Sequence, residues 1–147
     1  MASTYTPIAT YTASGTIGSY TFSSIPSTYT DLVAVLAPIA GGGAADIYMT
    51  YNGDTAGNYS STILYGSGSA AGRARYSNQS NIIIDFYGSA ISSEVSNRIL
   101  HIQNYSNTTT YKTAISRANR AGSGLDAIVG LWRSTSAISS ITFTLAS

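Results

Sequence analysis

The chain has 147 residues and no cysteine, only 9% of its residues are charged, and seven Lys and Arg against six Asp and Glu leave a net charge of +1. This length suits one domain, the lack of cysteine excludes disulfides and thiolate metal sites, and the charge gives no electrostatic reason for nucleic acid to be the main partner. No apolar run approaches the about 18 residues that a membrane-spanning helix needs.

Residues 1–16 are rich in Thr, Tyr and Ala and are predicted to form an extended N-terminal arm, followed by a single β-sandwich domain over residues 17–147. Pro7 suits an arm or an edge strand, because proline lacks the N–H group that an inner strand must donate. Tyr5 and Tyr11 of the arm each join a large apolar ring to a polar hydroxyl, a combination typical of subunit interfaces.

Short strands follow at even spacing, marked by alternating or continuous apolar residues between turn signals. We expect nine of them, at residues 19–24, 31–37, 47–51, 61–65, 81–87, 99–103, 111–116, 128–133 and 141–145. The almost wholly apolar segment 31–37 is predicted as a central strand. Asn52-Gly53 predicts a hairpin turn, because both positions of a type I′ turn need positive φ. The glycine-bearing segment 66–72 and the residues just after it are predicted as a loop.

Residues 99–132 hold two alternating strands with a polar turn between them, a basic loop, and a third strand that ends in the only tryptophan. Side chains alternate across a strand, so these runs predict a sheet with at least one buried face. No window of about 12 residues shows the apolar repeat of a helix. The sequence therefore predicts an all-β protein, a two-sheet antiparallel β-sandwich that is jelly-roll-like.

No group of residues predicts a reaction centre. His101 is the only histidine and no Gly-x-Ser-x-Gly segment accompanies it, so a Ser-His-Asp device is not indicated. The acids are scattered singly; Asp54 with Asn52 and Asn58 could hold calcium, but a hairpin turn is favoured because the spaced acids of a calcium-binding loop are missing. We predict no enzyme activity, no catalytic or metal-binding residue and no cofactor.

Arginines are the candidate binding residues. They are Arg73, Arg75, Arg117, Arg120 and Arg133. Gathered into a patch they would suit a carboxylate-bearing partner; otherwise they are solvated loop ends, and the sequence leaves both interpretations open. For an interface, the sequence favours Tyr5 and Tyr11 in the arm together with Arg117, Arg120 and Arg133.

Four segments carry a resemblance to a known family. They are SYTFSSIPSTYTDLVAV (19–35), YNGDTAGNYSSTILYG (51–66), IQNYSNTTTYKTAISRA (102–118) and GLWRSTSAISSITFTL (130–145). Together they resemble small virion structural proteins of tailed bacteriophages, notably cyanophages. In that family a glycine-bearing loop and a closing strand usually follow the region of 141–145, whereas this sequence stops at Ser147. We therefore expect an open edge on the last sheet, which a neighbouring chain could fill.

The resemblance implies a capsid decoration (cement) protein of the virion, which binds the outer capsid surface, stabilises the shell and has no enzymatic role. Its expected partners are the major capsid protein and further copies of itself, in a homo-oligomer and a trimer in particular. The alternative is a tail-fibre or spike tip that binds host surface glycans, with Tyr side chains and Trp132 as stacking platforms. A polysaccharide hydrolase is disfavoured, because no acid/base pair is visible.

Overall fold

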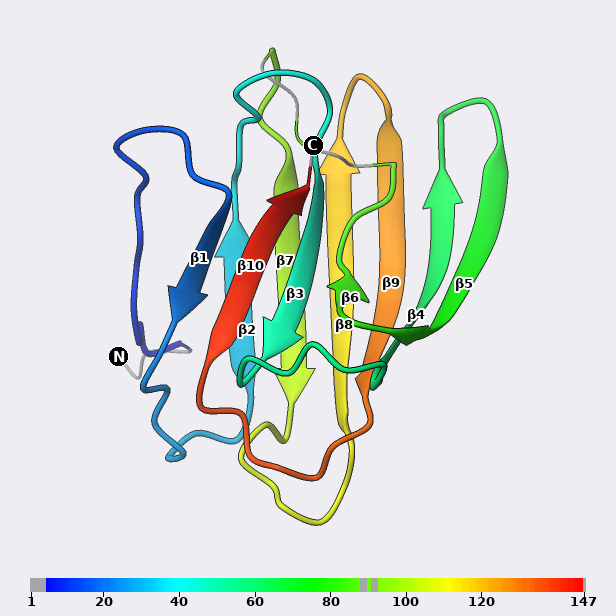
Figure 1. The fold of residues 1–147 in the computed structure, drawn as a ribbon. Helices are drawn as coiled ribbons and strands as arrows, with labels where there is room; N and C mark the ends of the chain where they lie inside the picture. Colours follow the sequence, from blue (N-terminus) through cyan, green and yellow to red (C-terminus); the bar gives the residue numbers. More distant parts are fainter. Residues whose placement is uncertain (1–4, 88–89, 91–92, 147) are drawn as a thin grey trace.

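The structure, a computed structural model, describes residues 5–87, 90 and 93–146. These residues form ten β-strands and no helix. The strands pair antiparallel and lie in two packed sheets, one of four strands and one of six. Figure 1 shows the four-stranded sheet in front of the six-stranded one, and we call them the front sheet and the back sheet. The predicted two-sheet antiparallel β-sandwich is thereby confirmed.

The front sheet has the strand order β1-β10-β3-β6. Its strands are β1 (Ser19–Phe22), β10 (Ile141–Ala146), β3 (Asp46–Tyr51) and β6 (Ile82–Ile83). β10 is paired along both sides, with β1 and with β3. The last strand is therefore an inner strand, and the edges of this sheet are β1 and the short β6. That a neighbouring chain fills an edge of this sheet stays a prediction.

The back sheet has the strand order β2-β7-β8-β9-β4-β5. Its strands are β2 (Leu32–Leu36), β7 (Asn97–Gln103), β8 (Lys112–Arg120), β9 (Gly124–Trp132), β4 (Tyr59–Gly66) and β5 (Ala71–Gln79). β2 lies at an edge, so its prediction as a central strand is wrong. The strand is apolar throughout because both of its faces are apolar. Leu32 faces the core, and Val33 and Val35 are exposed on the other side.

β5 is the strand that the sequence analysis assigned to a loop. In Figure 1 the β4–β5 hairpin lies beside the front sheet and is not covered by it, and no residue of β5 is fully buried. Without a buried face, the alternation that identifies strands is weak. The predicted strand 81–87 is also shorter, because the backbone N–H groups of Phe86 and Tyr87 bind the Asp126 carboxylate and do not join a ladder.

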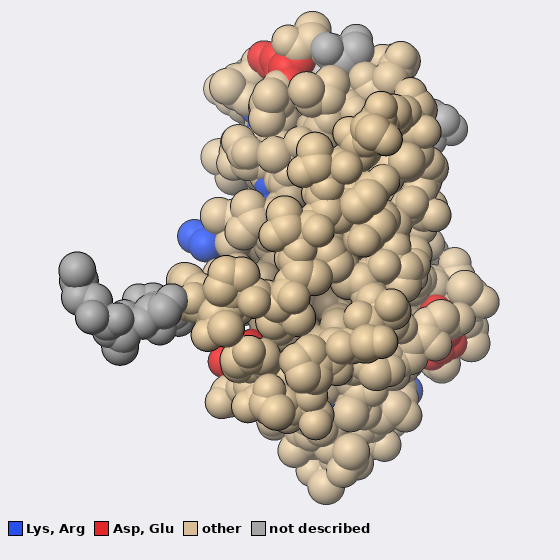
Figure 2. Space-filling model, turned by 90° about the vertical axis from the view of Figure 1, so that its left-hand side faces the viewer, with Lys and Arg blue, Asp and Glu red and all other residues tan. Residues whose placement is uncertain are grey.

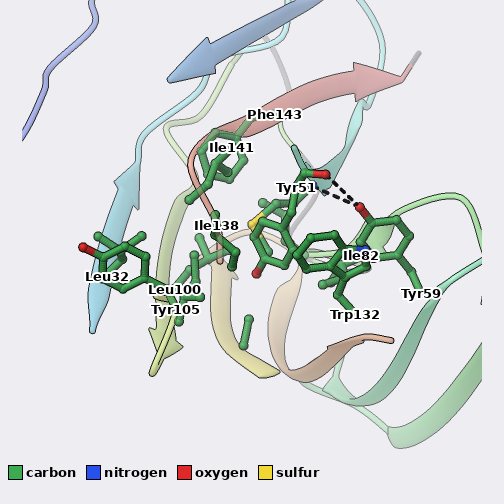
Figure 3. Close-up of a cluster of buried hydrophobic side chains, with 14 of the residues drawn as sticks. Leu32, Tyr51, Tyr59, Ile82, Leu100, Tyr105, Trp132, Ile138, Ile141 and Phe143 are labelled. Atoms are coloured by element: carbon green, nitrogen blue, oxygen red, sulfur yellow. Dashed lines mark hydrogen bonds between the residues drawn. The ribbon is translucent and has the colours of Figure 1, made fainter. Parts of the chain in front are cut away.

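The core lies between the two sheets, and Figure 3 shows many of its aromatic and aliphatic side chains. Tyr51, Tyr59 and Trp132 form an aromatic cluster with ring centroids 5.4, 6.2 and 6.4 Å apart. The backbone N–H of Tyr51 donates a hydrogen bond of 3.0 Å to the Tyr59 hydroxyl. A Cβ atom at Gly130 would lie 2.5 Å from Cγ2 of Ile82. Glycine at this position of β9 therefore lets β6 pack closely on the back sheet.

The Asn52-Gly53 turn has the backbone conformation that the sequence predicts, with φ of 53° and 69°. It does not close a hairpin, because the flanking strands β3 and β4 belong to different sheets. The side-chain oxygen of Asn52 instead accepts hydrogen bonds from the backbone N–H groups of Ser139 (2.9 Å) and Ser140 (3.1 Å). The turn is thereby tied to the segment that leads into β10.

The described part of the N-terminal arm, residues 5–16, forms no strand; residues 1–4 lie outside the described residues. Tyr11 stacks on Tyr20 of β1 with the ring centroids 3.6 Å apart. Ile8 and Ala9 line a groove between the edge strands β1 and β2. The arm thus lies against the side of the sandwich, and Figure 2, which looks onto this side, shows few charged atoms there.

Candidate interaction surface

A buried ion pair lies between the sheets. The Arg98 guanidinium contacts the Asp85 carboxylate, and both side chains are fully buried. Asp85 also accepts a hydrogen bond of 2.8 Å from the backbone N–H of Ile47, and Arg98 donates one of 2.6 Å to the Ser96 hydroxyl. Burial raises the pKa of Asp85 to about 6, although Arg98 and the Ile47 N–H oppose this shift. These groups bind one another and hold strands together.

The other buried charges are also held by protein groups. The Lys112 ammonium donates to the carbonyls of Thr110 (2.8 Å) and Thr135 (3.1 Å), and burial lowers its pKa. The Asp126 carboxylate accepts hydrogen bonds of 2.8 and 3.0 Å from the backbone N–H groups of Phe86 and Tyr87. Each of these charges therefore has a structural role in the loops and strand ends that it joins.

The outer face, by which we mean the face of the back sheet turned away from the front sheet, is a different environment. Strand pairing aligns its side chains in two rows that cross the whole sheet. The first row is Val33, His101, Ile115, Val129, Thr62 and Arg75, and the second is Val35, Ile99, Arg117, Ala127, Leu64 and Arg73. Directly opposed side chains on neighbouring strands lie within about 5.5 Å of each other, so each row is continuous.

Large apolar side chains are exposed on this outer face. The exposed fractions are 71% for Val35, 61% for Leu64, 59% for Leu125 and 50% for Val129. An antiparallel sheet that packs on a core with one face usually presents polar residues on the other. Contiguous exposed apolar surface of this kind marks interaction sites in soluble proteins. The back sheet therefore has two apolar faces, of which one is covered.

The charged side chains of the two rows are Arg73, Arg75 and Arg117, and all three are exposed. Among the described residues, the ion pairs of the chain lie elsewhere. No outward strand position of the back sheet carries an acid. Asp31, which precedes β2 at the far edge of the sheet, accepts a hydrogen bond of 2.7 Å from the Asn104 N–H.

The structure separates the residues that the sequence favours for an interface. Tyr5 and Tyr11 are exposed by 63% and 40% in the arm, and Arg117 lies on the outer face. Arg120 alternates to the opposite side of β8, where its Nε lies 3.6 Å from a carboxylate oxygen of Glu94. The guanidinium of Arg133 donates three hydrogen bonds of 2.7–2.9 Å to groups near β4 and β5. Arg117 is thus grouped with Arg73 and Arg75, not with Arg120 and Arg133.

His101 has no catalytic neighbours in its row. The residues directly opposite it on the adjacent strands are Val33 and Ile115, which supply neither a nucleophile nor an acid. In the ranges that the structure describes, no three His, Asp or Glu side chains gather into a metal-binding group. The same ranges contain no helix long and apolar enough to cross a membrane.

Asp54 is engaged with protein donors in the way that a structural turn requires. Its carboxylate accepts hydrogen bonds from the Trp132 indole N–H (2.7 Å), the Asn58 amide (3.0 Å) and the Ala56 backbone N–H (2.9 Å). The Asn58 and Trp132 bonds lower the pKa of Asp54. These contacts favour the turn interpretation over the calcium site, because the carboxylate oxygens already bind donors.

Trp132 is only 2% exposed and lies against Tyr59 with ring centroids 6.2 Å apart. It is therefore not a platform on which a glycan could stack, and this element of the glycan-binding alternative is wrong. The exposed tyrosines among the described residues are Tyr5, Tyr11, Tyr87 and Tyr111. None of these four lies in the two rows of the outer face.

The chain matches no protein-family model, no curated protein and no solved structure. The outer face and the arm are therefore the features from which a function has to be argued.

Proposed function

We propose that the protein is a structural component of a bacteriophage particle, a capsid decoration protein that binds the outer surface of the shell and stabilises it. The observation that carries the proposal is the exposed apolar outer face of the back sheet. The resemblance of four sequence segments to small virion proteins of tailed phages supports it independently. In this proposal the partners are the major capsid protein and further copies of the chain, in a trimer, and no enzymatic step is involved.

The dimensions of the outer face suit a stable protein contact. Six strands about 4.8 Å apart, with the central ones nine residues long, span roughly 700 Å². A standard protein interface takes about 800 Å² from each partner. Burial of Val35, Leu64 and Val129 against a shell would remove exposed apolar surface from water. Because the assembled shell alone offers this contact, binding would stabilise the assembled state by mass action.

The strand order supports a jelly-roll topology, an architecture found in viral capsid and lectin domains. In a jelly roll the first, last, third and sixth strands form one sheet, and the second, seventh, fourth and fifth form the other. β1-β10-β3-β6 has the first of these orders. The back sheet has the second, with the β8–β9 hairpin inserted between β7 and β4. We include a jelly roll with an inserted hairpin in the proposal.

The test is a count of copies on purified phage particles by quantitative mass spectrometry, combined with imaging of the intact particle. A decoration protein is expected on the order of hundreds of copies, distributed over the shell according to its symmetry. Particles that lack the protein should release their genome at a lower temperature. Complete absence of the chain from purified particles would contradict the proposal.

The alternative, a tail-fibre or spike tip that binds host glycans, is kept as a second outcome of the same measurement. A handful of copies located at the tail would support it. The tyrosines exposed outside the sheet, Tyr5 and Tyr111 among them, would then be the available stacking groups. Because Trp132 is buried in the core, it is not available to stack on a glycan.

A further inference from the structure

The outer face combines aliphatic side chains with cations in a defined order. On β9 and β4, the apolar residues Val129 and Leu64 lie in adjacent rows. Arg73 and Arg75 border this apolar strip on β5, and Arg117 borders it on β8. Neighbouring strands are about 4.8 Å apart, so Arg117 and Arg73, with β9 and β4 between their strands, lie roughly 14 Å apart in the same row.

We propose that the outer face docks onto a protein surface whose carboxylates pair with Arg73, Arg75 and Arg117 around an apolar centre. The inference rests on the proposed function and names the chemistry of the partner. Charge complementarity carries it: the rows hold three exposed arginines, and no acid occupies an outward position of the sheet. Arginine pairs with carboxylates through two parallel hydrogen bonds, which fixes orientation as well as affinity.

A second copy of the chain does not fit this face. Two outer faces packed together would bury the arginines of both copies without supplying a carboxylate for any of them. Removal of an unpaired charge from water is strongly unfavourable. Asp31 lies at the β2 edge of the sheet and already binds the Asn104 N–H. Contacts between copies of the chain therefore have to use another part of the molecule.

Nucleic acid and glycans fit the face less well. A phosphate backbone would engage the arginines but leave Leu64 and Val129 without an apolar partner. A glycan would need an aromatic platform, and neither row contains Phe, Tyr or Trp. A protein surface with carboxylates around an apolar patch satisfies both kinds of side chain.

The experiment measures rebinding of purified protein to phage shells from which the native copies have been stripped. The variants are R117Q, the triple variant R73Q/R75Q/R117Q, and the control R120Q, which removes a cation from the opposite side of β8. We expect R117Q to weaken binding about tenfold and the triple variant roughly 100-fold, because each loses a charge-assisted contact. R120Q should bind like the wild type. The wild type and the two outer-face variants should have the same midpoint of urea unfolding, because Arg73, Arg75 and Arg117 are exposed. R120Q loses the ion pair with Glu94, so its midpoint is measured as well, and binding is compared under conditions in which all four proteins are folded.

Two further arms address the partner directly. Amidation of the shell carboxylates with carbodiimide and ethanolamine should abolish rebinding of the wild type. Raising the salt concentration from about 50 mM to about 500 mM should weaken the wild type and leave the triple variant nearly unchanged, because exposed charge pairs are screened. A short DNA duplex added in excess should not compete.

The outcomes separate the two proposals. If wild-type protein does not rebind stripped shells at all, the proposed function fails. If it rebinds, but the triple variant binds equally well or amidated shells still bind, the carboxylate partner is wrong while the proposed function stands. Competition by the DNA duplex would likewise overturn a protein partner for this face.

Discussion

The two faces of the back sheet differ in how their charges are treated. On the inner side, Arg98, Asp85 and Lys112 are buried, and each is bound to a protein group. On the outer side, Arg73 and Arg117 are exposed in rows without an acid. Buried polar groups need hydrogen-bond partners within the fold, whereas exposed ones are hydrated and remain available to a binding partner. These three inner charges are therefore paired within the monomer, and the outer face is the surface on which function has to be sought.

The same strands contribute to both faces, which makes the comparison testable with neighbouring residues. On β9, Ile128 and Gly130 point inward, and Ala127 and Val129 point outward. On the inner face, a change in size or charge disturbs contacts that the fold needs. On the outer face, the same change should leave stability nearly unaltered and alter only binding. Paired substitutions on the two faces therefore measure how far folding and function are separated in this sheet.

The largest difference is expected for paired arginine substitutions. Arg98→Met leaves the Asp85 carboxylate buried without its cation and should lower the free energy of unfolding by about 3–5 kcal/mol. Arg117→Met, which removes an exposed guanidinium from β8, should change it by about 0.5 kcal/mol or less. Urea unfolding followed by circular dichroism measures both.

If Arg98→Met does not fold, Arg98→Lys offers a second measurement, since it keeps the charge but loses part of the hydrogen bonding and should be destabilised less. Equal losses of stability in Arg98→Met and Arg117→Met would show that the two faces are not distinct in the way described.

A smaller difference is expected on β9. Gly130→Ala places a methyl group 2.5 Å from Cγ2 of Ile82, and overpacking of this kind costs about 1–3 kcal/mol. Val129→Thr, one residue away on the outer face, keeps the β-branched shape and should cost about 0.5 kcal/mol or less. A Gly130→Ala variant as stable as the wild type would mean that β6 can shift away from β9 at little cost.

Much of the fold could be predicted because one-sided burial leaves a periodic pattern. Leu100 and Ile102 on β7, and Ile128 and Trp132 on β9, are buried as their alternation indicates. The alternation of apolar and polar residues is lost where a strand has no buried face, or where both of its faces carry apolar residues. β5 has no fully buried residue, and the apolar run of β2 reflects an outer face that is apolar as well as a core.

The inner face of β8 shows why the sequence alone could not decide which side is buried. Lys112, Ala114 and Ser116 face the core, although Ile115 on the other side is the more hydrophobic residue. Lys112 reaches the carbonyls of loop residues, and the Ser116 hydroxyl donates a hydrogen bond of 2.7 Å to the Ile84 carbonyl. Thr135 is 23 residues from Lys112, and Ile84 is 32 residues from Ser116. These partners come together only when the sheets are assembled.

The candidate site was predictable only in part, for a related reason. Arg117 was named from the sequence, and Arg73 and Arg75 were seen as members of one conceivable patch. Their grouping with Leu64 and Val129 depends on the pairing of β5 with β4 and of β4 with β9. Because β5 does not show a strand pattern, this register could not be derived, and neither could the rows of the outer face.

The smallest expected effect lies at the end of the back sheet, where the buried Trp132 is hydrogen-bonded to Asp54. The bonds from Asn58 and Trp132 lower the pKa of Asp54 in the folded protein. Asp54 therefore contributes stability above its unfolded pKa of about 3.9, and this contribution is lost as the pH falls through the lower, folded value.

Because Trp132 is the only tryptophan, its fluorescence emission should report this protonation directly. We expect an emission change with a midpoint below about pH 3.9, at a pH where circular dichroism still shows the folded sheet. Asp54→Asn keeps an acceptor for the indole but has no proton to bind, so the emission of this variant should not titrate in that range. Arg117→Met, on the outer face, should titrate like the wild type. An emission midpoint at or above the ordinary aspartate pKa, or the same titration in Asp54→Asn, would mean that the Asp54 carboxylate does not bind the indole N–H. The contrast between a paired inner face and an unpaired outer face would then not extend to this end of the sheet.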